Sequence, residues 1–317
     1  MFYDYMPQYI QIQNLIKSFG RNLVLKNVSF DINYKDIFGI IGISGSGKTT
    51  ILNILIGFLR SDGGNVLFQS RRIGEDKKTI RKTFGFATQG GSFYSKLSVL
   101  ENMEYFGRLY NISKGEIQRR SEMLLELMEL GDAKDTLANN LSTGMQRRLD
   151  IACAMIHDPD VLILDEPTED LDPVLRKEIL GLIRRINDQG TTIIITSHLL
   201  SEMESVCNKI TILHNGEILE TGTPDQLKDA YSKFEEIHLE TKPGNYDNIL
   251  KGLNKDYVRQ VIKKKHKIVI YTNEAQKLLK DILRVLDNSK EKLVDVDVNK
   301  PSLEEVFESL TRKRGRS

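Results

Sequence analysis

A glycine-rich segment at residues 42–49, Gly-Ile-Ser-Gly-Ser-Gly-Lys-Thr, restricts the possible folds of this chain more than any other part of the sequence. Its spacing is that of a phosphate-binding loop. An apolar run, Ile37–Ile41, precedes it and predicts a buried strand, and the mostly apolar run Thr50–Leu59 follows it and predicts a helix. A loop between a strand and a helix is the context that this motif needs. The chain is therefore predicted to contain an α/β domain that binds a nucleotide.

Each residue type in this loop suits the binding of phosphate for a physical reason. Gly42, Gly45 and Gly47 let the backbone turn tightly and aim successive N–H groups at phosphate oxygens. Lys48 would place its charge on the β- and γ-phosphates, and Thr49 would give its hydroxyl to Mg²⁺. The loop alone leaves open a kinase, a GTPase, a helicase or a transporter ATPase, and its structural alternative is a glycine-rich turn before an ordinary helix. The predicted nucleotide-binding residues here are Gly42, Ser44, Gly45, Ser46, Gly47, Lys48, Thr49 and Thr50.

Composition narrows the function further. The 317 residues carry a net charge of +1, which argues against a general nucleic-acid-binding protein, although basic residues gather at 263–267 and 312–316. Cys153 and Cys207 lie far apart in apolar or helical contexts, so we expect reduced thiols in a cytosolic protein. No apolar stretch approaches the roughly 18 residues of a membrane-spanning helix, and the N-terminus has no signal-peptide pattern. If the protein works at a membrane, we expect another chain to supply the membrane span.

The order of the patterns predicts two domains. Residues 8–230 are expected to form the nucleotide domain, in which polar and apolar positions first alternate as in antiparallel strands. A helical insertion is expected at about 98–157. Unbroken apolar or β-branched runs then follow at Val161–Leu164 and Thr192–Thr196, as in a parallel sheet. The predicted fold class is α/β, with an antiparallel β subdomain, a parallel sheet core and a helical insertion.

Residues 234–311 have a different pattern. Their elements are expected in the order β-α-β-β-α-β, which is that of a small α+β ferredoxin-like domain. Ser302 and Glu305 form a capping box for a last helix, and a basic tail follows at 312–317. Because this domain contains none of the nucleotide motifs, we expect a regulatory or dimerising role. The last helix would pack on its own domain or on a partner through an apolar stripe of Leu303, Val306, Phe307 and Leu310.

Four polar residues follow predicted strands and suit the chemistry of a bound triphosphate. Asp165 ends the run Val161–Leu164, so its carboxylate can reach a Mg²⁺ bound to the phosphates. Glu166 is placed to orient or deprotonate an attacking water. His198 would sense the γ-phosphate, and the amide of Gln89 would touch the metal or the water. The predicted catalytic residues are therefore Glu166, His198 and Gln89, and the predicted metal ligands are Thr49, Gln89 and Asp165.

In order and spacing, these motifs resemble those of an ATP-binding-cassette (ABC) ATPase over about residues 9–228. The matching segments are 42–49 (Walker A), Gln89 (Q-loop), 141–146 (signature), 161–166 (Walker B with its catalytic glutamate), 171–172 (end of the D-loop) and His198 (switch histidine). The resemblance implies further nucleotide contacts, with Phe19 stacking on adenine. These further residues are Phe19, Ser142, Thr143, Gly144 and Asp172.

Two departures from the family pattern concern the surface that a second subunit would meet. The signature is usually Leu-Ser-Gly-Gly-Gln, and here Thr143 stands at the first glycine. It adds a β-branched side chain beside Ser142 and Gly144, which are expected to meet the γ-phosphate of the opposite subunit at a helix N-terminus. The D-loop usually carries Ser-Gly or Ser-Ala before Leu-Asp, and here it carries Glu169-Asp170. We expect these acids to slow closure by repulsion or to pair with a basic group on the partner.

The resemblance implies an ATP- and Mg²⁺-dependent subunit of an ABC transporter. Its C-terminal extension, closing in Pro301-Ser-Leu-Glu-Glu-Val-Phe, resembles the tail of single-domain exporter ATPases of the drug, polysaccharide and sodium extrusion branch. The implied partners are a transmembrane permease subunit and a second copy of the chain or a homologous ATPase subunit, with no nucleic acid expected. The chain would be cytoplasmic and peripheral on the inner face of the cell membrane.

Two other functions remain open at this point. A non-transport ABC ATPase acting on ribosomes or nucleic acid would normally carry two cassettes or a long coiled coil, whereas this sequence has one phosphate loop and no sustained heptads. A regulatory module that holds ATP without hydrolysing it is disfavoured by Glu166 and His198. None of these motifs identifies a transported substrate, because its pathway lies in the membrane subunit.

Overall fold

The computed structural model describes residues 9–73, 80, 82–231, 235–264, 266–289, 291–299 and 303–304. The chain divides into two compact units, residues 1–224 and 225–317. Each unit is described by itself below. Among the described residues, no helix is both long and apolar enough to cross a membrane.

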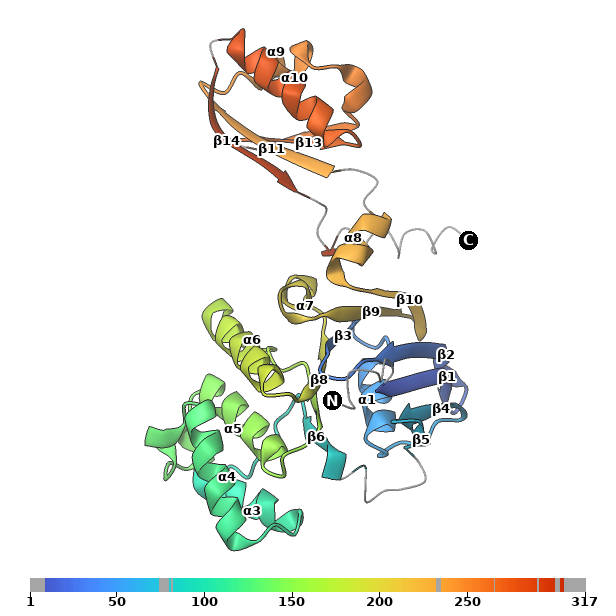
Figure 1. The fold of residues 1–317 in the computed structure, drawn as a ribbon, viewed down its shortest axis with the longest axis vertical. Coiled ribbons are helices and arrows are strands. Elements are labelled where there is room, and N and C mark those ends of the chain that lie inside the picture. The colour runs from blue at the N-terminus through green and yellow to red at the C-terminus, as the bar shows by residue number, and fades with distance from the viewer. Residues whose placement is uncertain are drawn as a thin grey trace, which may run out of the picture. The chain divides into compact units, whose positions relative to one another are not determined.

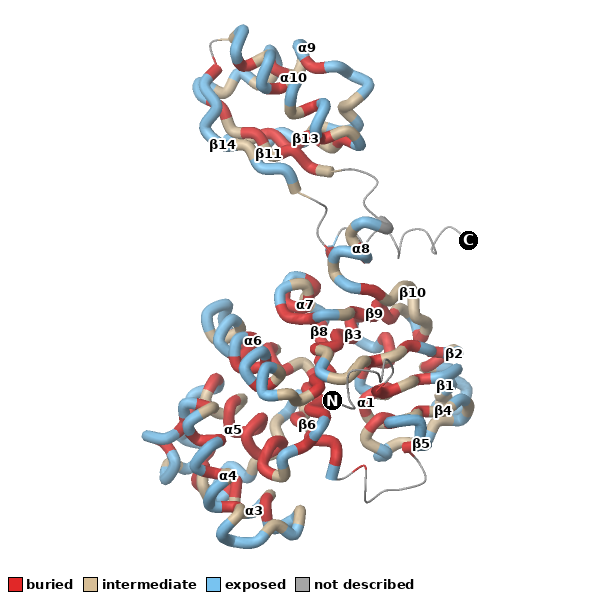
Figure 2. The backbone as a smooth tube through the Cα atoms, viewed as in Figure 1, coloured by how far each residue is buried: buried red, intermediate tan, exposed pale blue. Residues whose placement is uncertain are grey.

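The first unit is built on a six-stranded sheet with the order β10-β9-β3-β8-β7-β6 (Figure 1). Its strands pair in parallel except for β10, which is antiparallel to β9. Every residue of β3, β7 and β8 is buried (Figure 2), because helices or a second sheet cover both faces of such a sheet. The strands are β3 (Ile37–Ile41), β6 (Phe84–Ala87), β7 (Val161–Asp165), β8 (Thr192–Ser197), β9 (Lys209–His214) and β10 (Glu217–Gly222).

A second, antiparallel sheet in this unit has the order β2-β1-β4-β5, as the alternating pattern predicted. One hydrophobic core contains Ile10 and Phe68 of this sheet, Ile51 and Leu55 of helix α1, and Val161 of the parallel sheet. Helix α1 therefore packs between the two sheets. These elements are β1 (Ile10–Phe19), β2 (Asn22–Ile32), β4 (Gly63–Phe68), β5 (Arg71–Arg72) and α1 (Lys48–Leu55).

Helix α1 is shorter than the sequence pattern predicted. It ends at Leu55 rather than Leu59, and Gly57 then adopts a left-handed backbone with φ of 71°. This conformation, which glycine adopts without steric cost, is common just beyond a helix C-terminus. Phe58, which continues the apolar run in the sequence, consequently lies outside the helix and is exposed.

Three helices form the predicted insertion and lie to one side of the core sheet (Figure 1). Side-chain caps explain where they begin: Ser98 and Glu101 form a capping box at the first helix, and Ser113 caps the second. Glu129 accepts hydrogen bonds from Arg148 and Arg185, which ties the insertion to the following helix. The insertion helices are α3 (Val99–Leu109), α4 (Lys114–Leu127) and α5 (Thr143–Met155), with 3-10 turns at Gly131–Ala133 and Ala138–Asn140 between the last two. Helices α6 (Pro173–Asp188) and α7 (Leu200–Val206) follow strands β7 and β8.

The second unit is ferredoxin-like, as predicted. Its four strands are all antiparallel in the order β12-β13-β11-β14, and two helices complete the β-α-β-β-α-β sequence. The buried face of helix α10 contributes Leu278 and Ile282 to a core shared with Ile237 of β11. The elements are β11 (Glu235–Lys242), α9 (Tyr246–Gly252), β12 (Gln260–Lys263), β13 (Ile268–Thr272), α10 (Ala275–Asp287) and β14 (Lys292–Asn299), with a 3-10 turn at Lys255–Tyr257; helix α8 (Pro224–Tyr231) begins where the two units meet in sequence.

The predicted C-terminal helix is described only at Leu303 and Glu304, where Leu303 is buried. Most of its expected features lie outside the described residues. These are the capping box of Ser302 and Glu305, the stripe residues Val306, Phe307 and Leu310, and the basic tail 312–317.

Candidate nucleotide-binding site

A cavity of about 770 Å³ opens over the glycine-rich loop, between strand β3 and helix α1. Gly45 and Gly47 have left-handed backbones with φ of 78° and 111°, which allow the tight turn. A side chain at Gly42 would not fit, since its Cβ would lie 2.4 Å from Ser46 Oγ. The buried Ser46 hydroxyl has no hydrogen-bond partner among the described residues. The residues lining the cavity are Val24, Ile43, Ser44, Gly45, Gly47, Lys48, Thr49, Thr50, Gln89, Glu166, Glu169 and His198.

Lys48 is the buried cation of this cavity. It is the first residue of α1 and is 5% exposed, and its Nζ donates to the carbonyl of Gly42 at 2.8 Å. The same ammonium lies 3.0 Å from Oε1 of Glu166. Since a buried ammonium is costly without a counter-charge, this lysine needs an anion beside it. Glu166 supplies this anion, and the paired ammonium lies at the mouth of a backbone turn, where a phosphate site requires a positive charge.

Asp165 joins the loop to the ends of two core strands. Thr49 Oγ1 donates to its Oδ2 at 3.1 Å, and Thr196 Oγ1 donates to its Oδ1 at 2.6 Å. Thr196 also accepts a hydrogen bond from the backbone N–H of Glu166 at 2.9 Å. The carboxyl ends of neighbouring parallel strands β7 and β8 bring these groups together. A buried carboxylate and a hydroxyl consequently lie side by side next to the phosphate loop.

Glu166 is held from two directions. Lys48 contacts its Oε1, and Nδ1 of the half-exposed His198 lies 2.7 Å from its Oε2. Burial raises the pKa of Glu166, but the hydrogen bonds from His198 and Lys48 outweigh it and lower the pKa below its ordinary value. The residue also adopts a left-handed backbone with φ of 49°. The result is an ionised carboxylate whose direction is determined by its neighbours.

Gln89 contacts Glu169, for which the sequence predicted no partner within the same chain. The Nε2 of Gln89 donates to Oε2 of Glu169, and both side chains line the cavity. Ligand atoms of Glu166, Glu169 and His198 all lie within 4.8 Å of one another. The backbone carbonyl of Gln89 in turn accepts a hydrogen bond from Arg147 of α5 at 3.1 Å. Sequence reasoning missed Arg147, and its only signal was the position directly after the signature.

Several predicted nucleotide contacts lie away from this cavity in the single chain. Phe19 is 51% exposed at the end of β1, with Lys17 Nζ 5.4 Å from its ring centroid. Ser142 caps helix α5 by accepting from the N–H of Met145, and Asp172 caps α6 by accepting from two backbone N–H groups. The predicted nucleotide-binding residues that do not line the cavity of their own chain are Phe19, Gly42, Ser46, Ser142, Thr143, Gly144 and Asp172.

Apart from Phe19 and Asp172, these residues divide into two groups. Gly42 and Ser46 form the loop itself, where the close approach of the Ser46 side chain leaves no room for a Cβ at Gly42. Ser142, Thr143 and Gly144 lie at the N-terminus of α5. For these signature residues, contact with the nucleotide of a second copy stays a prediction.

Comparison with known proteins agrees with this geometry. The family model "ABC transporter" matches residues 25–169, and the model "ATP-binding protein DrrA1-3-like, C-terminal domain" matches residues 222–311. The Nod factor export ATP-binding protein I of Rhizobium sp. (strain N33) is 32% identical over 307 residues, which cover 95% of this chain and 96% of that protein. The linearmycin resistance ATP-binding protein LnrL of Bacillus subtilis (strain 168) is 29% identical over 304 residues, which cover 95% of this chain and 98% of that protein.

Solved structures match about two thirds of the chain. The structure of cbiO1 from Clostridium perfringens, part of an ABC transporter complex, has a TM-score of 0.65 and 26% identity, and the match covers 70% of this chain and 90% of that one. The bacterial ABC transporter cassette MJ0796, solved as a dimer, has a TM-score of 0.61 and 27% identity, and the match covers 68% of this chain and 98% of that one. With relatives matched along nearly its whole length, the chain belongs to the ATP-binding subunits of the ABC transporter family and is an ATPase.

Proposed function

We propose that this chain is the ATP-hydrolysing subunit of an ABC exporter and drives a separate membrane subunit. The observation that carries the ATPase chemistry is that Lys48 and Glu166 line one cavity above the phosphate loop, while the buried Asp165 lies directly behind the lining residue Thr49 and accepts a hydrogen bond from it. Support for export comes from the relatives, whose names describe Nod factor export and linearmycin resistance. The chain would act at the inner face of the cell membrane.

The residues beside the loop fit a magnesium ion. Thr49 and Asp165 offer a hydroxyl and a carboxylate oxygen, the hard donors that Mg²⁺ prefers. The amide oxygen of Gln89 is a third donor on the same cavity. When bound, Mg²⁺ would neutralise charge on the phosphates. In this proposal Lys48 binds the β- and γ-phosphates, and the loop N–H groups orient them.

Glu166 would orient the attacking water and accept its proton. Its lowered pKa keeps the carboxylate ionised, and the contact with His198 holds its direction. Apart from the attacking water, the site must also be closed to bulk solvent. A second copy of the chain, or a homologous subunit, would supply this by covering the γ-phosphate with the N-terminus of α5 at Ser142 and Gly144.

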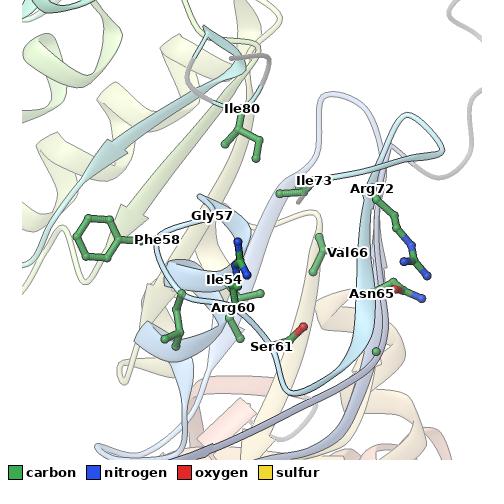
Figure 3. A pocket seen from close by; sticks show the side chains of 12 residues that line it. Ile54, Gly57, Phe58, Arg60, Ser61, Asn65, Val66, Arg72, Ile73 and Ile80 are labelled. Carbon is green, nitrogen blue, oxygen red and sulfur yellow. The ribbon is translucent and has the colours of Figure 1, made fainter. Parts of the chain in front are cut away.

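A surface on the first unit suits the membrane subunit. Phe58, just beyond α1, is 87% exposed, and it lines a pocket of about 410 Å³ (Figure 3). The exposed arginines Arg60 and Arg72 line the same pocket, and buried Ile54 and Ile73 form part of its apolar wall. An exposed aromatic side chain beside an apolar wall and flanked by cations suits an amphipathic helix that carries an acidic residue. We infer that a cytoplasmic helix of the membrane subunit docks there.

The test is co-purification from detergent-solubilised membranes after co-expression with the membrane proteins encoded beside this chain. The wild type should co-purify with one of them, and Phe58→Asp should weaken the association at least tenfold, an effect typical of a central apolar contact. Leu283→Asp, at a 42% exposed position on α10, is the control and should co-purify normally. Failure of the wild type to associate with any membrane protein would overturn the transport function.

A further inference from the structure

Glu169 occupies a place where the family pattern has a serine, and its carboxylate lies in the nucleotide cavity. The turn that carries it begins at Glu166, whose carbonyl accepts from the N–H of Glu169 at 3.1 Å. Asp170 then adopts a left-handed backbone with φ of 59°. The chain therefore adds a second carboxylate to the end of the cavity that holds Glu166 and His198.

The two carboxylates differ in their partners. Glu166 contacts both Lys48 and His198, whereas no ion pair to Glu169 is found in the described part of the chain. The partner of Glu169 is the neutral amide of Gln89. Because like charges in a partly desolvated site repel strongly, a γ-phosphate held by Lys48 would be repelled by the carboxylate of Glu169.

Gln89 connects this carboxylate to the helical insertion. Arg147 of α5 donates to the carbonyls of Thr88 and Gln89, both at 3.1 Å. Asp150, one turn further along α5, accepts from the N–H of Ser92 at 2.6 Å. The segment that carries Gln89 is thus bonded to α5 on both sides, and α5 carries the signature at its N-terminus.

We propose that Glu169 is a positioning residue that holds Gln89 until a γ-phosphate enters the cavity. Repulsion between the phosphate and the Glu169 carboxylate then breaks the bond to Gln89, and the freed segment shifts α5 through Arg147. This mechanism makes the helical insertion respond to ATP and not to ADP, which lacks the γ-phosphate. The inference rests on the proposed role of the cavity in ATP hydrolysis.

The test compares ATP and ADP binding to the purified full chain at a constant Mg²⁺ concentration. Glu169→Gln removes the charge and keeps an amide oxygen that can accept from Gln89. It should raise the affinity for ATP about tenfold, the scale of about 1.4 kcal/mol, and leave the affinity for ADP unchanged. Glu126→Gln removes a charge on the exposed face of α4, outside the residues that line the cavity. It should change neither affinity.

Hydrogen exchange of the backbone amides at 88–92 gives a second readout. It would not change if Glu169 only repelled the phosphate and did not hold Gln89. Without nucleotide, Glu169→Ala should exchange faster than the wild type, to the rate that ATP induces in the wild type, whereas Glu169→Gln should remain protected. Equal effects of Glu169→Gln on ATP and ADP, or no effect on either, would overturn the proposal. If the wild type itself neither bound nor hydrolysed ATP, the proposed function would fail instead.

Discussion

Glu166 illustrates how single residues in this protein depend on contacts from distant parts of the chain. Its backbone follows a buried strand into a left-handed conformation, and its two oxygens contact Lys48 and His198. The lowered pKa means that protonation, and the loss of these contacts, begins only as the pH falls below the ordinary range for glutamate. The side chain should therefore remain a base throughout the neutral range.

Replacing this carboxylate by an amide should separate binding from chemistry. Glu166→Gln should retain ATP binding while turnover falls roughly 100-fold or more, the usual scale for loss of a general base. Less repulsion against the phosphates should let an ATP-bound dimer accumulate, which size-exclusion chromatography with ATP and Mg²⁺ would detect. Glu126→Gln, on the exposed face of α4, is the control. Near-normal turnover of Glu166→Gln would exclude this residue as the base.

Among the elements, helix α5 combines the most functions. Ser142 caps it, Thr143 is its exposed first residue, and Gly144 packs so closely that an added Cβ would lie 3.0 Å from Leu175. Arg147 and Asp150 bond it to the segment that carries Gln89. A small change at its N-terminus should therefore affect the approach of a second subunit more than the fold.

Thr143→Gly tests the N-terminus of α5. Removing the β-branched side chain should tighten ATP-driven dimerisation or raise turnover, because the helix end can then approach a phosphate more closely. The cost to the helix should be only a few tenths of a kcal/mol. Dimerisation measured by analytical ultracentrifugation and steady-state turnover would check this expectation. A loss of both would show instead that the threonine makes an adapted contact.

Two buried groups, one in α5 and one just after its C-terminus, should change the folding stability in opposite directions as the pH falls. Burial raises the pKa of Asp150 to about 6, so its folded form takes up a proton first and gains stability between about pH 6 and 4. Burial lowers the pKa of His157 to about 4, so its unfolded form takes up the proton first and stability is lost between about pH 6.5 and 4. Each difference corresponds to roughly 3 kcal/mol.

In Asp150→Asn, the loss of stability that His157 causes at low pH should no longer be offset. Its free energy of unfolding in urea should fall by roughly 2 kcal/mol more than that of the wild type between pH 7 and pH 4.5, since the compensating carboxyl is gone. His157→Gln should show the opposite difference. Parallel pH profiles for all three proteins would contradict the assigned pKa directions.

Across the complete chain, every residue proposed to bind phosphate or metal lies in the first unit. A chain ending after Tyr231 keeps helix α8 whole and should bind ATP as tightly as the full chain. Self-association, or coupling of hydrolysis to the membrane partner, should change instead, because we infer a regulatory or dimerising role for the ferredoxin-like unit. Equilibrium ATP binding, sedimentation and transport by the reconstituted complex would measure each effect. If all three matched the full chain, that role would have to be abandoned.

Neighbouring residues in the sequence were sufficient to predict the local elements and the chemistry of the loop. Residues 42–49 specify a phosphate site because the glycines, lysine and threonine are contiguous. The alternation of β and α patterns was likewise enough to predict both the parallel core and the ferredoxin-like order. These features depend on neighbours in the chain, so their physical causes are visible in the sequence.

Contacts between residues far apart in the sequence could be identified only in the folded structure. The contact of Gln89 with Glu169 spans 80 positions, and that of Arg147 with Gln89 spans 58. The early end of α1, which exposes Phe58, likewise depends on a backbone turn at Gly57 that apolar periodicity does not reveal. Side chains on separate elements meet only after the sheet order and the turns between strands and helices are established, and no local pattern in the sequence encodes such a meeting.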